Sequence, residues 1–298
     1  MASVKFSFWP ATSHPPAEVL AEARQAEAEG WYGVWLADHY MPNTPDGAPA
    51  DGPVHEAWSL LSALATATER VRIGTLVSPT SVHHPALLAN RAVTIDHLAG
   101  GRMVLGLGAG WQVNEHAAYG FELEEPGPRV TRFEESIQIV RSLLVEERTT
   151  FRGKVYDVVD APCDPKPVQQ RLPIVVGSGS PRMLRITARY ADEWNTWGTP
   201  ETAAASREKL LAACEQVGRD PGTVHCSINS IVRLDEEAVP GRPSIGGSAA
   251  QLADQIGRYA EAGYDEFIVN GASLTGAAAE RSDMLARLGT EVLGQLSE

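Results

Sequence analysis

The sequence predicts an α/β fold in which eight β/α units close into one (β/α)8 barrel, a TIM barrel with an insertion between units four and five. Three observations support this fold class. Short apolar runs alternate with longer helical stretches along the whole chain. No linker or change of composition divides residues 1–298, so a single domain is expected. Apolar residues make up 43% and charged residues 21%, which is ordinary for a globular protein with a large core.

Eight runs rich in apolar and β-branched residues are predicted to be the strands, because parallel strands buried on both faces read as continuous apolar segments. They cover residues 4–9, 33–37, 71–77, 103–107, 173–176, 192–196, 224–232 and 266–269. The third, fourth and fifth of these are expected to be neighbours in a closed sheet. An open, doubly wound sheet is the alternative arrangement.

Each strand is followed by a segment with helical periodicity. The first of these segments has proline near its start and ends at Gly30, as helices commonly do. In the fourth, Phe133, Ile137, Val140 and Leu144 recur at spacings of four, three and four residues. The predicted helices cover residues 16–30, 56–68, 85–98, 131–144, 181–190, 200–217, a stretch marked by Leu252, Ile256, Tyr259 and Ala260, and 277–296.

Two segments depart from this rhythm. The stretch 122–170 is predicted to be the insertion; it contains the helix 131–144, and its residues 151–159 are expected to be a small strand pair or an excursion outside the repeat. In a barrel it would lie over one end, and we expect it to form a wall of the active site. Residues 235–247 are rich in proline and glycine and are predicted to be a loop.

Charge and composition exclude several classes of partner. The formal net charge is -13, and no basic run offsets it, so neither nucleic acid nor anionic lipid is expected to bind. No apolar stretch approaches the roughly 20 residues of a membrane helix, and no signal peptide is recognisable. The odd number of cysteines, Cys163, Cys214 and Cys226, contains no Cys-x-x-Cys pair. Free thiols in a reducing cytoplasm are therefore expected.

The reactive groups of a (β/α)8 barrel project from the C-terminal ends of its strands. Glycine, polar residues and tryptophan are concentrated after these ends, which suits a flat aromatic cofactor held by backbone amides. They are Trp9-Pro10, Asp38-His39-Tyr40, Ser78-Pro79, Gly108-Ala109-Gly110-Trp111 with Asn114, Gly177-Ser178-Gly179-Ser180, Trp194 and Trp197, and Asn270-Gly271.

One of these segments has the character of a phosphate site. Gly177 and Gly179 allow close backbone approach, and the following helix start offers free N–H groups to an anion. Ser178 and Ser180 add hydroxyl donors, and Arg182 adds positive charge. The alternative is a plain turn with a serine cap.

Asp38-His39 is the best acid/base candidate, because histidine titrates near neutrality. A rim histidine that only makes a hydrogen bond is the alternative. His83-His84 is not predicted to bind a metal, because adjacent histidines tend to point apart and no carboxylate lies at helical spacing.

A classical NAD dehydrogenase is disfavoured by the glycine spacing. Gly106 and Gly108 are followed by Trp111 where the Gly-x-Gly-x-x-Gly rule requires a third glycine. The second glycine cluster fails in the same way.

An ordered set of segments runs over nearly the whole chain. It comprises Ala37-Asp38-His39, Arg70 to Val77, Ser78-Pro79, His84 to Ala89, Asp96 to Arg102, Gly106 to Trp111, Asn114-Glu115, Pro173 to Gly177 and Ala191 to Trp194. Together these segments resemble the bacterial luciferase-like monooxygenase superfamily. The Asp-His pair and Asn114 are similar to the branch that uses the deazaflavin coenzyme F420.

The resemblance implies that Asp38, Thr75, Leu76, Ser78, Ala109, Gly110 and Asn114 surround the deazaflavin. It implies that Gly177, Ser178, Gly179, Ser180, Arg182 and Met183 hold its phosphate. It also implies a backbone bulge near Thr75-Leu76, often with a non-proline cis peptide, and a role for His39 in moving a proton beside the reacting carbon.

The chain departs from the sugar-phosphate dehydrogenases of this branch at two positions. These enzymes carry glutamate where Trp111 stands and tryptophan where Asn43 stands. Sugar-6-phosphate oxidation is therefore not expected, and Trp111 suits a less polar substrate.

The resulting interpretation is an F420-dependent oxidoreductase that transfers a hydride between the deazaflavin and a small organic substrate. A monooxygenase that uses reduced FMN and dioxygen is the first alternative, and a non-catalytic ligand-binding barrel is the second. The resemblance also makes a homodimer possible.

Overall fold

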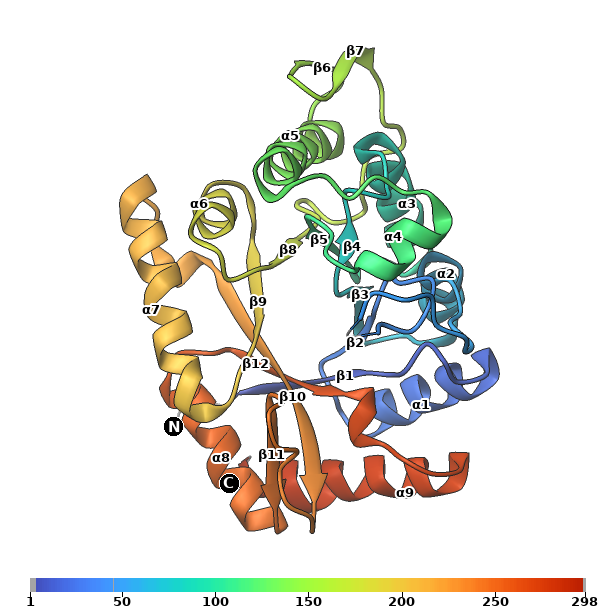
Figure 1. Ribbon diagram of the computed structural model, residues 1–298. Coiled ribbons are helices and arrows are strands. Elements are labelled where there is room, and N and C mark those ends of the chain that lie inside the picture. The colour runs from blue at the N-terminus through green and yellow to red at the C-terminus, as the bar shows by residue number, and fades with distance from the viewer. Residues whose placement is uncertain (1–3, 45, 297–298) are drawn as a thin grey trace.

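A computed structural model of the protein describes residues 4–44 and 46–296. Eight parallel strands form a closed barrel, because each pairs with the next and the last returns to the first (Figure 1). In sheet order they are β1 (Lys5–Trp9), β2 (Gly33–Leu36), β3 (Arg72–Thr75), β5 (Met103–Gly108), β8 (Ile174–Gly177), β9 (Glu193–Trp197), β10 (His225–Leu234) and β12 (Glu266–Asn270). The predicted barrel is confirmed, with β3, β5 and β8 as neighbours.

An outer layer of helices surrounds the strands. Helices α3, α6 and α7 have the predicted bounds, and the others differ from prediction by a few residues at their ends. They are α1 (Pro16–Ala28), α2 (Ala57–Ala67), α3 (Pro85–Leu98), α5 (Pro126–Val145), α6 (Pro181–Tyr190), α7 (Pro200–Val217), α8 (Ala249–Glu261) and α9 (Ala278–Arg287). The predicted closing helix continues beyond α9 as a wider helical turn, Leu288–Leu293, and a last short helix, α10 (Gly294–Leu296).

Two kinds of core stabilise this arrangement. Large apolar clusters lie between the sheet and the helices, as burial of each helix's apolar face requires. A smaller cluster fills the inside of the barrel, where Trp35, Leu76, Val104, Val175 and Ile268 pack together. The barrel is therefore a packed core and its chemistry belongs to its ends.

Charged residues lie at the N-terminal ends of the strands. Arg72, Glu193, His225 and Glu266 are the first residues of β3, β9, β10 and β12. Arg72 pairs with Glu193, and the carboxylate of Glu266 lies 2.9 Å from Nε2 of His225. Burial raises the pKa of Glu193 even though Arg72 opposes this. This cluster lies at the N-terminal end of the barrel, where residues serve the stability of the fold. Arg72 contributes its positive charge, which balances the carboxylates.

The insertion lies elsewhere than expected. Helix α5 takes its place in the outer layer between α3 and α6, so only a hairpin of β6 (Thr149–Arg152) and β7 (Asp157–Ala161) is additional. Glu135 of α5 accepts hydrogen bonds from the backbone N–H groups of the hairpin turn, Lys154, Val155 and Tyr156. The hairpin therefore stands outside α5, away from the strands (Figure 1), and the expected wall over the barrel end is not formed by it.

Two short strands and one short α-helix were not predicted. They are β4 (Ser78–Pro79), which pairs with β5, β11 (Ser244–Gly247), which pairs with β10, and α4 (Val113–Tyr119). The predicted loop 235–247 thus contains a strand. Helix α4 ends at Gly120, whose φ of 72° is left-handed, and it lies at the C-terminal end of the barrel.

Candidate active site

The residues predicted to react lie at the C-terminal ends of neighbouring strands. Asp38 and His39 follow β2, Ser78 lies in β4 after β3, Asn114 belongs to α4 after β5, and Gly177 ends β8. Because β2, β3, β5 and β8 are adjacent in the barrel, these groups share one side of the same rim.

Asp38 is the centre of a buried polar network. Its Oδ2 accepts hydrogen bonds from Nε1 of Trp58 at 3.0 Å, from Oγ of Ser78 at 2.5 Å and from Nε2 of His83 at 2.9 Å. Burial alone would raise the pKa of Asp38, but the hydrogen bonds from His83, Ser78 and Trp58 outweigh it and lower that pKa. Its Oδ1 is buried without a partner and remains available as an acceptor.

The two adjacent histidines do point apart. His83 turns inward to Asp38, and Nη1 of Arg91 lies 3.3 Å from its Nδ1. His84 instead caps α3, where its Nδ1 accepts from the N–H of Ala86.

His39 is held by a residue that the sequence reasoning did not single out as functional. Its Nδ1 lies 2.9 Å from Oε1 of Glu115, a carboxylate that is 1% exposed. The other carboxylate oxygen accepts the backbone N–H of Tyr40 at 2.9 Å. The His39 side chain itself is 26% exposed, and its ring meets the Trp111 indole edge-on at 5.6 Å. His39 is thus fixed on one side and accessible on the other.

The chain leaves β3 through an unusual backbone. The peptide bond between Leu76 and Val77 is cis, one residue beyond the position that the resemblance indicated. The hydroxyl of Thr75 donates to the carbonyl of Gly106 at 3.1 Å. A Cβ at position 106 would lie 1.8 Å from the carbonyl oxygen of Thr75, so only glycine allows β3 and β5 to approach this closely.

The loop after β5 carries Ala109, Gly110 and Asn114. Gly110 has a φ of 92°, and a Cβ there would lie 2.0 Å from Oγ of Ser81. Nδ2 of Asn114 donates to the carbonyl of Pro42 at 2.8 Å, whereas its Oδ1 is buried without a partner. The rim therefore holds a second buried acceptor besides that of Asp38.

The predicted phosphate segment opens α6 as expected. Helix α6 begins at Pro181 without a side-chain cap from Ser180, so its first-turn N–H groups are not satisfied by that residue. Nothing lies within 4 Å of a Cβ built at Gly179. The indole of Trp194 is buried and donates to the carbonyl of Ser178 at 2.7 Å, so it supports this turn from below and is not part of the rim surface.

Two side chains of this segment point elsewhere. The guanidinium of Arg182 donates to the carbonyl of Gly127 and to the side chains of Thr131 and Glu134 on α5. Met183 is 4% exposed and belongs to the apolar core. If these two residues hold a phosphate, Met183 does so through its backbone, and the charge of Arg182 is partly neutralised by Glu134.

Aromatic rings surround the mouth of the barrel. Trp111 is 57% exposed, although exposed tryptophan is uncommon on a soluble surface. Trp9 and Trp197 end β1 and β9, and their rings lie 5.6 Å apart. The mouth therefore offers aromatic surface beside its polar groups.

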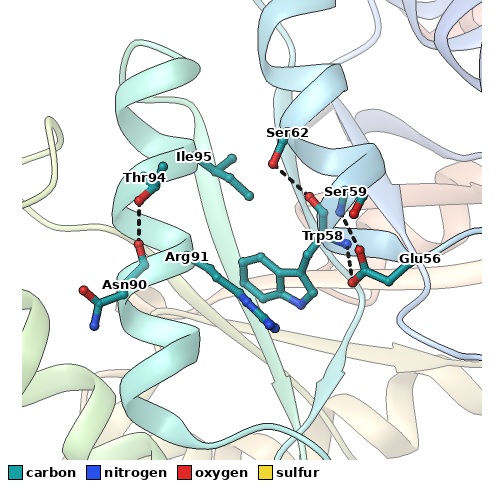
Figure 2. Close-up of a pocket in the computed structure, with 8 residues that line it drawn as sticks. All are labelled: Glu56, Trp58, Ser59, Ser62, Asn90, Arg91, Thr94 and Ile95. Atoms are coloured by element: carbon teal, nitrogen blue, oxygen red, sulfur yellow. Dashed lines mark hydrogen bonds between the residues drawn. The ribbon is translucent and has the colours of Figure 1, made fainter.

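A groove of about 390 Å³ lies on the outside of the barrel between α2 and α3 (Figure 2). Figure 2 shows Trp58 in its floor with Arg91 reaching toward it, the guanidinium carbon lying 5.8 Å from the ring centre. The same tryptophan donates its indole N–H to Asp38, so the groove and the rim share one side chain.

Among the described residues, no helix is both long and apolar enough to cross a membrane.

Replacing Asp38 with Asn is expected to lower the free energy of unfolding by about 1–3 kcal/mol, because the amide keeps only one acceptor oxygen. Its NH2 group then either faces the donors at the Oδ2 position or is buried without an acceptor at the Oδ1 position. The pKa of Asp38 is lower in the folded protein than in the unfolded chain, where it is roughly 3.9. The carboxylate therefore stabilises the fold at pH values above the unfolded-state pKa, and this contribution is lost as the pH falls through the folded-state pKa. Urea unfolding across this range should show the gap between wild type and variant narrowing in acid. A difference in unfolding free energy that does not change with pH would contradict the role of the ionised Asp38 in stabilising the fold.

Known proteins resemble this chain in sequence and in fold. A family model described as luciferase-like monooxygenase matches residues 1–239. An F420-dependent glucose-6-phosphate dehydrogenase of Kineococcus radiotolerans is 32% identical over 226 residues, which are 74% of this chain and 65% of that protein. The chain spans between about half and two thirds of the length of the curated relatives it matches first, from 52% to 65%.

Two solved structures share the whole fold. An F420-dependent secondary alcohol dehydrogenase in complex with an F420–acetone adduct has a TM-score of 0.83 at 20% identity, over 97% of this chain and 99% of that one. The coenzyme F420-dependent tetrahydromethanopterin reductase of Methanopyrus kandleri has a TM-score of 0.85 at 17% identity, over 99% and 100% of the two chains. At these identities the two structures establish the fold alone. The family model covers most of the chain, and this protein therefore belongs to the luciferase-like monooxygenase family.

Proposed function

We propose that this protein is an F420-dependent oxidoreductase that transfers a hydride between the deazaflavin and a small organic substrate. The observation that carries the proposal is the pairing of His39 with the buried Glu115 at the C-terminal rim. This pair lies on the part of the barrel where family members of this fold carry out their chemistry. The sequence similarity to F420-dependent dehydrogenases supports the same choice.

The donor set at the rim fits such a cofactor. The unpartnered oxygens Oδ1 of Asp38 and Oδ1 of Asn114 are acceptors suited to ring N–H groups. The uncapped start of α6 at Ser180 offers backbone N–H groups to a phosphate. Once bound, the deazaflavin supplies a two-electron hydride carrier, and the protein supplies orientation and proton transfer.

His39 is the residue that we propose to move the proton. Hydride transfer to or from a carbonyl or an activated alkene requires a matching proton transfer. Glu115 occupies Nδ1 of the ring, which leaves Nε2 as the nitrogen that can face a substrate. The neighbouring Trp111 adds apolar surface beside the imidazole.

The rim chemistry favours a substrate less polar than a sugar phosphate. Trp111, Trp9 and Trp197 offer aromatic surface, and the one arginine of the phosphate segment, Arg182, is already engaged by α5. We therefore expect an uncharged carbonyl, alcohol or alkene.

The protein is expected to bind F420 more tightly than FMN. Parallel fluorescence titrations of the two cofactors on the same preparation measure this preference. A clear preference for FMN would move the protein to oxygen-using monooxygenase chemistry. Binding of neither cofactor would favour a ligand-binding barrel without turnover.

The cellular setting that we propose is the cytoplasm. Cys163, Cys214 and Cys226 are all buried and free, which fits a reducing compartment. A homodimer stays a prediction.

A further inference from the structure

We propose that Glu115 is a positioning residue that holds His39 in the tautomer protonated at Nδ1, so that Nε2 alone exchanges the proton of the reaction. The second half of this statement rests on the proposed function, whereas the tautomer does not. Glu115 therefore acts through His39 and need not touch substrate or cofactor.

The two oxygens of Glu115 have different partners. Oε2 accepts the backbone N–H of Tyr40 at 2.9 Å, and a backbone N–H can only donate. Oε1 lies 2.9 Å from Nδ1 of His39. An ionised carboxylate has no proton to give, so the hydrogen bond to Oε1 requires the proton on Nδ1 of the imidazole.

The position of Glu115 is itself fixed by the fold. Two further hydrogen bonds join the start of α4 to the loop after β2, and both are accepted by backbone carbonyl groups of consecutive residues in that loop. Nε2 of Gln112 donates to Met41 at 2.9 Å, and Nδ2 of Asn114 donates to Pro42 at 2.8 Å. These contacts hold α4 against the loop that carries His39. The short helix thus holds the carboxylate between Nδ1 of His39 and the backbone N–H of Tyr40.

Another histidine of the same rim shows what a purely structural role looks like. His116 uses both ring nitrogens, since Nδ1 lies 2.7 Å from the carbonyl of Gln112 and Nε2 lies 2.8 Å from Oγ of Ser81. His39 uses only one. Within the described part of the chain its Nε2 has no hydrogen-bond partner, and the side chain is 26% exposed. A locked Nδ1 beside a free Nε2 is the arrangement of a proton-transfer group that is aimed by a carboxylate.

Glu115→Gln separates this role from simple packing, because the amide has nearly the same shape but one oxygen instead of two. If the amide oxygen keeps the N–H of Tyr40, the NH2 group faces His39 and must donate to Nδ1. Neutral His39 then carries its proton on Nε2. The opposite amide orientation leaves the part-buried N–H of Tyr40 against a donor, so it is the less favourable one.

The tautomer can be read directly by long-range ¹H–¹⁵N NMR on protein labelled with ¹⁵N-histidine, at alkaline pH and without any cofactor. A His39→Gln sample assigns the signals. We expect the Nδ1-protonated form in wild type and the Nε2-protonated form in Glu115→Gln. If His39 of the wild-type protein is protonated at Nε2, the proposal is wrong. This measurement on wild type does not depend on whether a Glu115 variant folds. An unchanged tautomer in a folded Glu115→Gln would overturn it too.

Turnover supplies the second readout. Glu115→Gln is expected to lower kcat by at least about tenfold with little change in F420 affinity, and Glu115→Asp should recover part of the loss. Glu124→Gln is the matched control, because that carboxylate pairs with Arg132 instead of a rim histidine, and it should keep wild-type turnover. A switched tautomer with full kcat would overturn the positioning role. Absence of F420-dependent turnover in wild type would instead refute the proposed function and leave the NMR result standing.

Discussion

Replacing His39 with alanine is expected to lower turnover with F420 by at least about tenfold while the dissociation constant of the cofactor changes much less. General acid or base assistance typically contributes about 10² to 10⁴ in rate, and a proton carried by solvent recovers only part of this. The imidazole lies at the rim, is fixed by Glu115 and is accessible at Nε2. Loss of the imidazole removes the proton carrier but leaves both buried acceptors of the rim, Oδ1 of Asp38 and Oδ1 of Asn114, in place.

The measurement compares kcat at saturating cofactor with the cofactor dissociation constant from fluorescence titration. It follows a screen that identifies a working substrate. His97→Ala is a suitable control, because this histidine lies on the outer helix α3 and contacts the carbonyl of Lys166. If His39 only packs against the cofactor, binding weakens while kcat at saturation survives. Full turnover at saturation would remove His39 from the mechanism.

Replacing Gly179 with leucine is expected to weaken cofactor binding by more than about tenfold, because the side chain would occupy the space in front of the helix start where the phosphate is proposed to lie. The fold itself should tolerate the change, since a Cβ at this position meets nothing within 4 Å and the residue is exposed. The loss should therefore appear in affinity and leave the thermal unfolding temperature nearly unchanged.

Gly257→Leu provides the matched control. This glycine lies in α8 on the outer layer, and a Cβ there also meets nothing within 4 Å. The control variant should bind the cofactor as wild type does. If the titration curves of Gly179→Leu and wild type coincide, the phosphate binds elsewhere on the rim. The segment from Gly177 to Arg182 would then be a plain turn.

The local pattern of the chain was enough to predict the barrel. Strand and helix periodicities arise from neighbouring residues, so the closed order of eight units and the bounds of α3, α6 and α7 could be predicted without tertiary information. The same patterns place Asp38 and Ser78 after their strands. In the structure they meet, because the barrel brings successive strand ends together.

The tertiary structure decided which side chains pair. Glu115 lies 76 positions from His39 in the sequence, and only the packing of α4 against the loop after β2 joins them. The same holds for His83, which contacts Asp38, and for Arg182, which turns to α5 instead of standing free at the helix start. The hairpin β6–β7 likewise stands outside the ring because Glu135 holds its turn. A polar side chain reaches several acceptors from one backbone position, so the fold and not the local sequence selects its partner.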